Sequence, residues 1–330
     1  MRPGQASLTA EYMALFRALE SVGPSTTRLF YDPFAIGFLR PALRAAVAAS
    51  RTPVLGRLVP WLIDRRWPGA RSSGVARTRL IDDALADAVR RGARQVAILG
   101  AGFDCRACRL PGLSGVRIFE VDHPQTQEAK RSWFEQRFGH APAAVAFAAV
   151  DFDCHSLADR LIAAGFDAAV PTFFVWEGVT NYLTEPAVDS TLRFIGSTAP
   201  GSRVVFTYVH RGMIDGTESF PGTGRLTRTL RRVGEQWTFG FEPAEVPAYL
   251  AARGLRLIED LGAREYRARY LPGGAAILGY EFYRAALAEA GPGQPSPRPP
   301  ATAPTEAEAG AADVNVKCRR RDDGGLNGLR

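Results

Sequence analysis

The chain has few cysteines and few histidines for its 330 residues. Its four cysteines are too few for a disulfide scaffold in a protein of this length. Cys105 and Cys108 form a C-x-x-C motif, but the sequence offers no second pair of cysteines or histidines at the spacing of a zinc site. We therefore expect neither a disulfide framework nor a bound metal ion.

Long apolar runs are missing as well. No stretch approaches the roughly 20 consecutive apolar residues that a membrane-spanning helix needs. The first residues also lack the continuous apolar segment and the small-residue cleavage site of a secretory signal. These absences predict a cytoplasmic protein without a membrane partner.

Acidic residues are scarce in the first quarter of the chain. Residues 1–79 hold 12 arginines and four acids, which accounts for the net charge of +7. A basic face is compatible with nucleic acid, but no recognisable nucleic-acid-binding motif accompanies it. We expect a solvated arginine-rich surface and no nucleic-acid partner, and a cap that attracts an anionic substrate stays open as an alternative.

Apolar residues, at 46% of the chain, suffice for one globular core. Residues 8–21 place them at helical spacing, and 39–67 continues as short apolar-rich helices interrupted by prolines. A longer helix is expected over 73–91, where it stops before Gly92. We interpret residues 1–70 as a helical cap that belongs to the same domain as the rest.

The pattern changes after this helix, because short apolar runs now alternate with helical stretches. The seven candidate strands are 95–100, 116–122, 144–151, 171–178, 202–209, 255–262 and 275–283. Strands that are apolar on both faces and separated by helices predict a doubly wound α/β fold with a mostly parallel sheet. Segment 262–274 is polar and ends in turn residues, so the last two strands are expected to form an antiparallel hairpin.

Two further segments stand out by composition. Residues 71–286 form the expected core domain, and within it the glycine-rich segment 210–241 is predicted to be a lid over the substrate, with the N-terminal helices as the opposite wall. Residues 287–330 are rich in proline, alanine, glycine and glutamate, which predicts a disordered tail.

A glycine turn follows the first strand, at Gly100-Ala101-Gly102. Glycines at the carboxyl end of a first strand let a nucleotide approach the backbone. The third glycine of the dinucleotide fingerprint is absent, because Cys105 occupies that position, and this disfavours a bound pyrophosphate. The pattern therefore predicts a site for a nucleoside without phosphates.

Acidic residues end the next three strands. Asp122 stands about 20 residues after the turn, where a carboxylate can bind both hydroxyls of a ribose, and capping of the following helix is the alternative. Asp151 and Phe152 could hold an adenine through its amine and its ring face. Glu177 could face a cationic group of the ligand, and capping remains open for Asp151 and Glu177 too.

Together these segments resemble the leucine carboxyl methyltransferase family and its bacterial relatives. The resemblance covers roughly residues 9–285 and rests above all on GAGFDCRACRL, EVDHP and EGVTNYL in combination. It implies a Rossmann-like methyltransferase fold and S-adenosylmethionine as cofactor. Carried over by position, it implies that Arg77 grips the cofactor carboxylate and that Gly100, with Gly102, lies under the methionine portion.

The resemblance further implies that Asp122 binds the ribose, that Asp151 and Phe152 hold the adenine, and that Glu177 contacts the amino-acid end. The implied reaction is O-methylation of a carboxylate or hydroxyl on an acceptor whose identity is open. A carboxylate needs no general base, whereas an alcohol or phenol does. His210, Tyr208 and His123 are candidates for such a base, and none is assigned.

Two alternatives remain. A nicotinamide-dependent oxidoreductase is disfavoured by the absent third glycine, the expected final hairpin and the lack of a Tyr-x-x-x-Lys pair. A protein that binds S-adenosylmethionine without catalysis stays open, because Cys105 and Cys108 replace a threonine and an aromatic residue of the family pattern.

Overall fold

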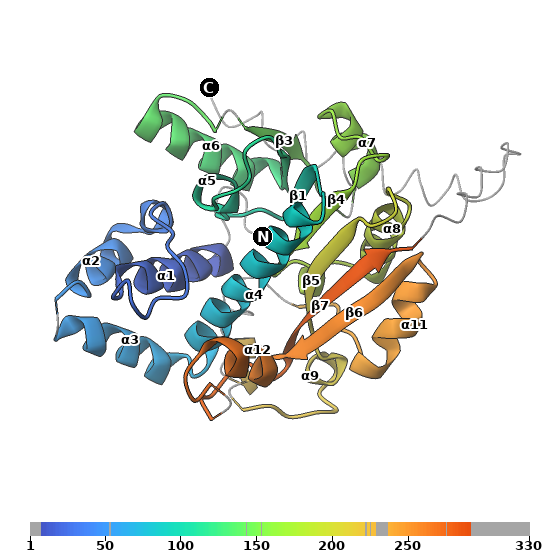
Figure 1. The fold of residues 1–330 in the computed structure, drawn as a ribbon. Helices are drawn as coiled ribbons and strands as arrows, with labels where there is room; N and C mark the ends of the chain where they lie inside the picture. The colour runs from blue at the N-terminus through green and yellow to red at the C-terminus, as the bar shows by residue number, and fades with distance from the viewer. Residues whose placement is uncertain are drawn as a thin grey trace, which may run out of the picture.

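The computed structural model describes residues 8–52, 54–142, 144–152, 154–221, 223–224, 226–228, 237–274 and 276–291. They form a seven-stranded sheet with the order β3-β2-β1-β4-β5-β7-β6 (Figure 1). The strands are β1 (Gln95–Leu99), β2 (Arg117–Asp122), β3 (Val145–Ala149), β4 (Thr172–Trp176), β5 (Arg203–Val209), β6 (Leu255–Gly262) and β7 (Tyr283–Ala290). The predicted doubly wound α/β fold is confirmed.

The strand order determines where a ligand can enter. Strands β1 to β5 are parallel, and the chain returns from β3 at one edge to β4 on the other side of β1. The loops after β1 and β4 therefore leave the sheet toward opposite faces and open a crevice at the carboxyl ends. Strand β7 is antiparallel to both β5 and β6, as the expected terminal hairpin requires.

Helices surround the sheet and form a cap beside it. Their bounds are α1 (Leu8–Val22), η1 (Ala35–Phe38), α2 (Pro41–Ala49), α3 (Leu55–Arg66), α4 (Ala70–Arg90), α5 (Arg106–Arg109), α6 (Pro124–Phe138), α7 (Leu157–Ala163), η2 (Thr180–Tyr182), α8 (Glu185–Gly196), α9 (Arg211–Asp215), η3 (Pro243–Glu245), α11 (Val246–Ala251) and α12 (Ala263–Tyr270). None of these described helices combines the length and the apolar character of a membrane-spanning segment.

Alternate residues of β1 build two separate cores. Val96 and Ile98 pack on one face of the sheet against α4, whereas Ala97 and Leu99 pack on the other face against α7, α8 and α11. All five residues of β1 are buried. Burial on both faces explains why the strands read as continuous apolar runs instead of alternating ones.

The cap, made of α1, α2, α3 and η1, is attached to the sheet domain through charged groups. The Arg17 guanidinium on α1 contacts the Asp32 carboxylate at 3.0 Å and donates a 2.6 Å hydrogen bond to the carbonyl oxygen of Phe103. Arg17 and Asp32 are both buried. The N-terminal helices are thereby held against the loop that follows β1.

The prediction of the last strand was wrong in position. We expected residues 275–283 to be a strand, but β7 begins at Tyr283 and continues to Ala290. It thus includes residues 287–290 of the expected tail, whose residues 292–330 lie outside the described part of the chain. Segment 262–274, which we expect from its polar residues to be the connection of a hairpin, contains the helix α12.

Side chains of neighbouring helices explain both differences. Ser72 donates to the carbonyl oxygen of Leu278, Ser73 accepts from the N–H of Tyr280, and Arg267 donates to the carbonyl oxygen of Ile277. The backbone before β7 is therefore bonded to α4 and α12, although its apolar residues suggest a strand. Helix α12 buries Ala263 and Tyr266 against α4, a contact that its polar sequence does not reveal.

Candidate active site

A cavity of about 350 Å³ lies at the carboxyl ends of the parallel strands. All the residues that the sequence proposed for cofactor binding line it, although they come from five separate segments. They are Arg77, Gly100, Gly102, Asp122, Asp151, Phe152 and Glu177. The tertiary structure brings the whole predicted set to one place.

The glycine turn after β1 adopts a backbone conformation that suits glycine. Gly100 has φ +67° and Gly102 has φ +49°, in the left-handed region. A Cβ on Gly100 would lie 2.2 Å from Cγ2 of Val179, whereas one on Gly102 would be 3.5 Å from Cβ of Ala10 on α1. The turn thus runs close under the loop after β4 and under the cap, with backbone exposed to the cavity.

Asp122 at the end of β2 holds this turn in place. Its carboxylate accepts hydrogen bonds from the N–H of Gly102 and, at 2.6 Å, from the N–H of His123. The residue that caps α6 is His123, whose Nδ1 accepts from the N–H of Gln125. Burial raises the pKa of Asp122, and the two backbone donors oppose this rise. Asp122 is therefore a positioned acceptor at the cavity wall, not the cap of α6.

Arg77 and Glu177 face each other across the cavity floor. Nε of Arg77 on α4 lies 2.8 Å from Oε1 of Glu177, and the guanidinium carbon lies 4.6 Å from the ring centre of Tyr283. Burial alone would raise the pKa of Glu177, but Arg106 and Arg77 outweigh it and lower that pKa. Glu177 stays ionised, and its charge is neutralised by arginines instead of by a helix end.

A buried charge network behind this pair was not found from the sequence. Arg106 contacts Glu177 at 3.0 Å and Asp82 at 2.7 Å, and it also pairs with Asp104. Arg109 joins the same network through Asp82 at 2.7 Å. The signal available was the pair of arginines in GAGFDCRACRL, but burial of an arginine depends on its acidic partners and is not visible in one segment.

Asp151 and Phe152, the candidates for adenine binding, line the cavity just after β3. The ring of Phe152 is stacked at 6.5 Å from that of Trp176, with an angle of 30° between the rings. The N–H of Asp151 donates to Nδ1 of His155 at 3.0 Å, which holds the turn after β3. Phe152 thus lies next to a buried tryptophan at the end of β4.

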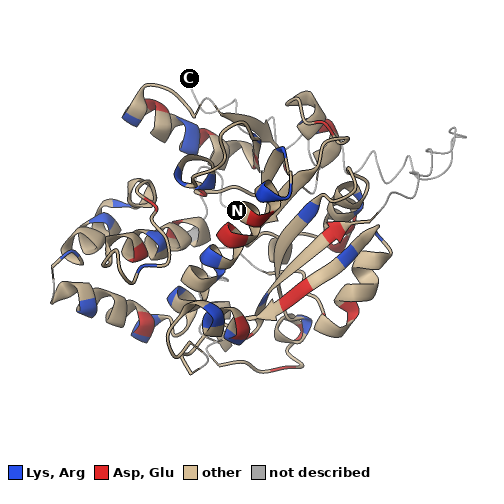
Figure 2. Cartoon of the chain, in the orientation of Figure 1, with Lys and Arg blue, Asp and Glu red and all other residues tan. Residues whose placement is uncertain are grey.

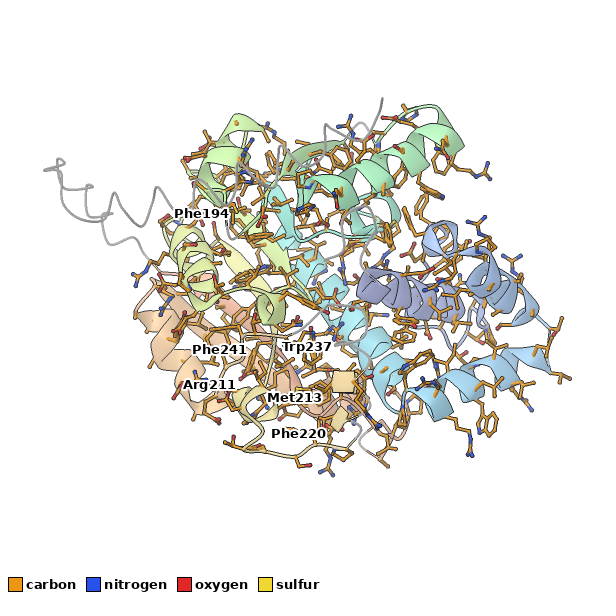
Figure 3. All side chains as sticks on the ribbon, turned by 180° about the vertical axis from the view of Figure 1, so that it is seen from behind. Phe194, Arg211, Met213, Phe220, Trp237 and Phe241 are labelled. Carbon is orange, nitrogen blue, oxygen red and sulfur yellow. The ribbon has the colours of Figure 1, made fainter. Side chains whose placement is uncertain are left out.

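The wall opposite the strands is aromatic and comes from the cap, from the segment before β7 and from the predicted lid. Tyr12 on α1 lies 5.1 Å from Trp67, and Trp237 lies 6.1 Å from Tyr283 between ring centres. Trp237 stands near the middle of the molecule in the view from behind (Figure 3). Leu226, from the same segment, also lines the cavity.

Comparison with known proteins agrees with this geometry. The family model described as leucine carboxyl methyltransferase matches residues 10–196, more than half of the chain. The chain belongs to the leucine carboxyl methyltransferase family. It is therefore an S-adenosylmethionine-dependent methyltransferase.

Relatives support the assignment, and a solved structure shares the fold. A Streptomyces coelicolor protein is 38% identical over 65% of this methyltransferase and 73% of its own length, and one from Mycobacterium sp. strain KMS is 33% identical over 75% and 83%. The names of both assign them provisionally to the S-adenosyl-L-methionine-dependent methyltransferases. A structure from Thermobifida fusca, named provisionally as a methyltransferase, shares the fold with a TM-score of 0.53 and 16% identity, covering 88% of this chain and 97% of its own.

Two of the three candidate bases lie away from the cavity of this methyltransferase. Tyr208 is buried, and its hydroxyl donates to Asp260 at 2.6 Å and accepts from Arg284 at 3.0 Å. Burial, together with Asp260, raises the pKa of Tyr208 well above its usual value. His210 does not line the cavity, and only His123 does, on the side of Asp122.

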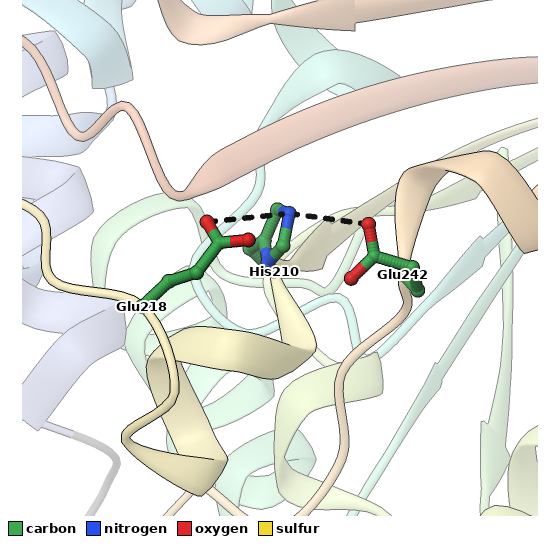
Figure 4. Close-up of side chains that lie close together, drawn as sticks. All are labelled: His210, Glu218 and Glu242. Carbon is green, nitrogen blue, oxygen red and sulfur yellow. Dashed lines mark ion pairs between the residues drawn. The ribbon is translucent and has the colours of Figure 1, made fainter.

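His210 instead lies between two carboxylates (Figure 4). Its Nε2 is 3.7 Å from Glu218 and 3.5 Å from Glu242. Its Nδ1 accepts from the N–H of Gly212 at 3.2 Å, so the ring carries its proton on Nε2. A metal ion on Nε2 would need that position deprotonated, so a neutral Nε2–H that faces the two carboxylates fits the arrangement better than a metal site.

The C-x-x-C cysteines are also inert in this setting. Cys105 is buried and Cys108 is half-buried, and both are free thiols. Burial raises the pKa of the Cys105 thiol well above its usual value and that of Cys108 to about 11. A protonated thiol is a poor nucleophile, so neither cysteine has the character of a reactive group.

Proposed function

We propose that this methyltransferase methylates an oxygen, either a carboxylate or a hydroxyl, on a small acceptor with an apolar or aromatic body. The observation that carries the proposal is the composition of the cavity at Arg77 and Glu177. Glu177, the lining carboxylate that contacts Arg77, is held by two arginines and has a lowered pKa, so it is a weak base. An acceptor that is already ionised, or one of low pKa, suits such a site.

The residues that line the cavity fit the cofactor. Gly100 and Gly102 leave their backbone open to the cavity, where a Cβ would narrow the space. Asp122 offers a carboxylate that could accept the two ribose hydroxyls, and Arg77 keeps guanidinium nitrogens beyond the Nε that it gives to Glu177. We propose Phe152 and Asp151 for the adenine and Glu177 for the ammonium end.

In this mechanism the chain contributes position and exclusion of water. Bound S-adenosylmethionine supplies an electrophilic methyl group on a sulfonium. Arg77, fixed by Glu177 and by the Tyr283 ring, would hold the amino-acid end in one orientation. The aromatic wall with Tyr12 and Trp67 would keep the acceptor and the methyl group away from water.

The proposal also assigns the acceptor and the cofactor to different segments of the chain. The cap at 1–70 and the segment 210–241 would form the acceptor side, and the core at 71–286 the cofactor side. Tyr12, Trp67 and Trp237 support this, because the first two come from the cap and the third from the predicted lid. A location in the cytoplasm is part of the proposal too.

The test is transfer of a labelled methyl group from S-adenosylmethionine to a panel of acceptors. The panel pairs aromatic carboxylic acids and phenols with amines of the same carbon skeleton. We expect label in the acids or phenols, and loss of label in mild base when the product is a methyl ester. Transfer to the amines alone would overturn the proposal.

Calorimetric titration separates cofactor use from acceptor choice. S-adenosylmethionine should bind to the wild type and NADH should not. If S-adenosylmethionine binds but no acceptor of the panel is methylated, the proposed O-methylation of these acceptors is contradicted although the cofactor is used.

A further inference from the structure

Helix α3 carries an apolar face that points away from the protein. Of the eleven large hydrophobic residues that are exposed in the described part of the chain, five lie in or next to this one helix. Their exposed fractions are 76% for Val54, 36% for Leu55, 40% for Leu58, 54% for Trp61 and 50% for Leu62. We call these five residues the α3 face.

The spacing makes the α3 face continuous. Positions 55, 58 and 62 follow one another at intervals of three and four, so they share one side of the helix, with Trp61 beside them. The opposite side is apolar too, since Ile63 is buried in the core of the cap and Val59 packs against it. The helix therefore has more apolar surface than the described part of the chain covers.

Basic residues predominate in the segment that contains the α3 face. Residues 33–68 contain six arginines and a single acid, Asp64, for a net charge of +5. Asp64 is paired with Arg71 at 2.6 Å, and Arg65 lies over the Trp61 ring at 5.7 Å. Figure 2 shows α2 and α3 at the edge of the molecule that is farthest from β6, with blue positions predominating over red.

We propose that the α3 face is a docking surface for membranes that contain anionic phospholipids. An exposed stripe of leucine and tryptophan with arginines around it is the pattern of a helix that lies in the plane of a bilayer interface. A second copy of the chain is a poorer occupant, because two such faces would bring two sets of like charges together. Nucleic acid would leave the leucines without an apolar partner.

This surface was not expected from the sequence, which predicted no membrane partner because no spanning segment exists. A helix that lies in the plane of a bilayer interface needs only one apolar side. The sequence does not show which side of a helix the rest of the protein leaves exposed. The C-terminal end of α3 lies next to the cavity, since Trp67 and Ala70, which follow the helix, line it. An apolar acceptor dissolved in the bilayer would then be near the cavity wall.

The test is co-sedimentation of the full chain with vesicles. One set is pure phosphatidylcholine and the other is equimolar phosphatidylcholine and phosphatidylglycerol. We expect the wild type to pellet with the second set only and to be released by high salt. The variant with Leu58→Asp and Leu62→Asp should remain in the supernatant with both sets.

A charge variant and a matched control complete the experiment. Arg57→Gln with Arg65→Gln should lower partitioning about 30-fold, since each arginine near an anionic surface contributes about fivefold. The control on α7 combines Ile162→Asp with Arg160→Gln, two exposed positions outside the α3 face, and should bind like the wild type. Thermal unfolding and titration with S-adenosylmethionine check that every variant is folded.

Three outcomes would overturn the proposal. The wild type could stay in the supernatant with both vesicle sets, or the control could lose binding as much as the α3 variants. A wild-type dimer in size-exclusion chromatography that Leu58→Asp with Leu62→Asp converts to a monomer would assign the α3 face to a second copy. None of these results depends on methyl transfer, so they leave the proposed function untouched.

Discussion

Nε of Arg77 and Oε1 of Glu177 are 2.8 Å apart at the floor of the cavity, although the two residues are 100 positions apart in the chain. The family resemblance implies that Arg77 binds the cofactor carboxylate and that Glu177 contacts the amino-acid end. Their mutual contact means that the floor is electrically balanced and that the guanidinium is oriented within the protein itself. Arg77 therefore loses little side-chain conformational entropy when the cofactor binds.

The first prediction concerns this ion pair. Glu177→Gln leaves two buried guanidinium groups, of Arg77 and Arg106, without one of their counter-charges, so it should lower the free energy of unfolding by about 3 kcal/mol. Urea unfolding followed by circular dichroism measures this. A loss below about 1 kcal/mol would mean that solvent already screens the pair.

A double variant separates stability from binding. Arg77→Met combined with Glu177→Gln removes both charges and should regain part of the stability that Glu177→Gln loses. It should not regain affinity for S-adenosylmethionine. Full recovery of affinity would show that Arg77 has only a structural role.

The second prediction concerns Asp122. Asp122→Asn keeps the size of the side chain but replaces one carboxylate oxygen with an N–H₂ donor, which cannot accept a hydroxyl proton. Because a hydrogen bond to a charged group contributes about 1.5–3 kcal/mol, affinity for S-adenosylmethionine should fall by about 10- to 150-fold in calorimetric titration. Glu128→Gln, an exposed carboxylate on α6, is the matched control and should leave affinity unchanged.

The third prediction is a pH dependence. Burial acts to raise the pKa of Asp104, but Arg106 and Arg17 outweigh it and lower that pKa from 3.8 to about 2. A carboxylate with a lowered pKa stabilises the fold fully above the unfolded value near 3.8 and loses this contribution as the pH falls through 2. The loss should be about 2 kcal/mol.

Urea midpoints between pH 6 and acid measure this effect. The wild type should lose stability on acidification more steeply than Asp104→Asn, which has no carboxylate to protonate at this position. Parallel curves for the two proteins would contradict the prediction.

The fourth prediction compares the two glycines of the turn. Gly100→Ala combines a left-handed backbone with a Cβ 2.2 Å from Val179, so it should destabilise the protein by at least about 1–2 kcal/mol and weaken cofactor binding. Gly102→Ala meets Ala10 only at 3.5 Å and should show the backbone cost alone. Thermal unfolding of both variants measures the difference.

Adding Val179→Ala to Gly100→Ala distinguishes the two causes. It removes the atom that the new Cβ would meet, so the double variant should recover toward the stability of Gly102→Ala. No recovery would show that backbone strain accounts for the whole effect.

Local pattern was sufficient for much of this protein. The apolar runs around Val96 and Phe173, the glycine turn at Gly100 and the acid at Asp122 each predict their element or position from a few neighbouring residues, because strand burial and turn conformation are local demands. The family resemblance added Arg77, which nothing in its own helix marks as functional.

The position of the last strand depends on residues that are distant from it in the chain. The strand β7 is rich in alanine, which has low β-propensity, and is held by pairing with β5 on one side and β6 on the other. The described residues of the more apolar segment before β7 do not pair with a strand there. Its backbone forms hydrogen bonds with the side chains of Ser73 and Arg267. A window of sequence could not show either set of partners.

The sequence by itself thus determined the α/β class, the order of the elements and the residues that end each parallel strand, since these follow from periodicity and turn chemistry. Only the tertiary structure decided that Arg77 pairs with Glu177, that Arg106 is buried among acids, and that no described residue covers the α3 face. Ion pairing and burial depend on groups that are distant in the chain, and their energies exist only once the fold has brought those groups together.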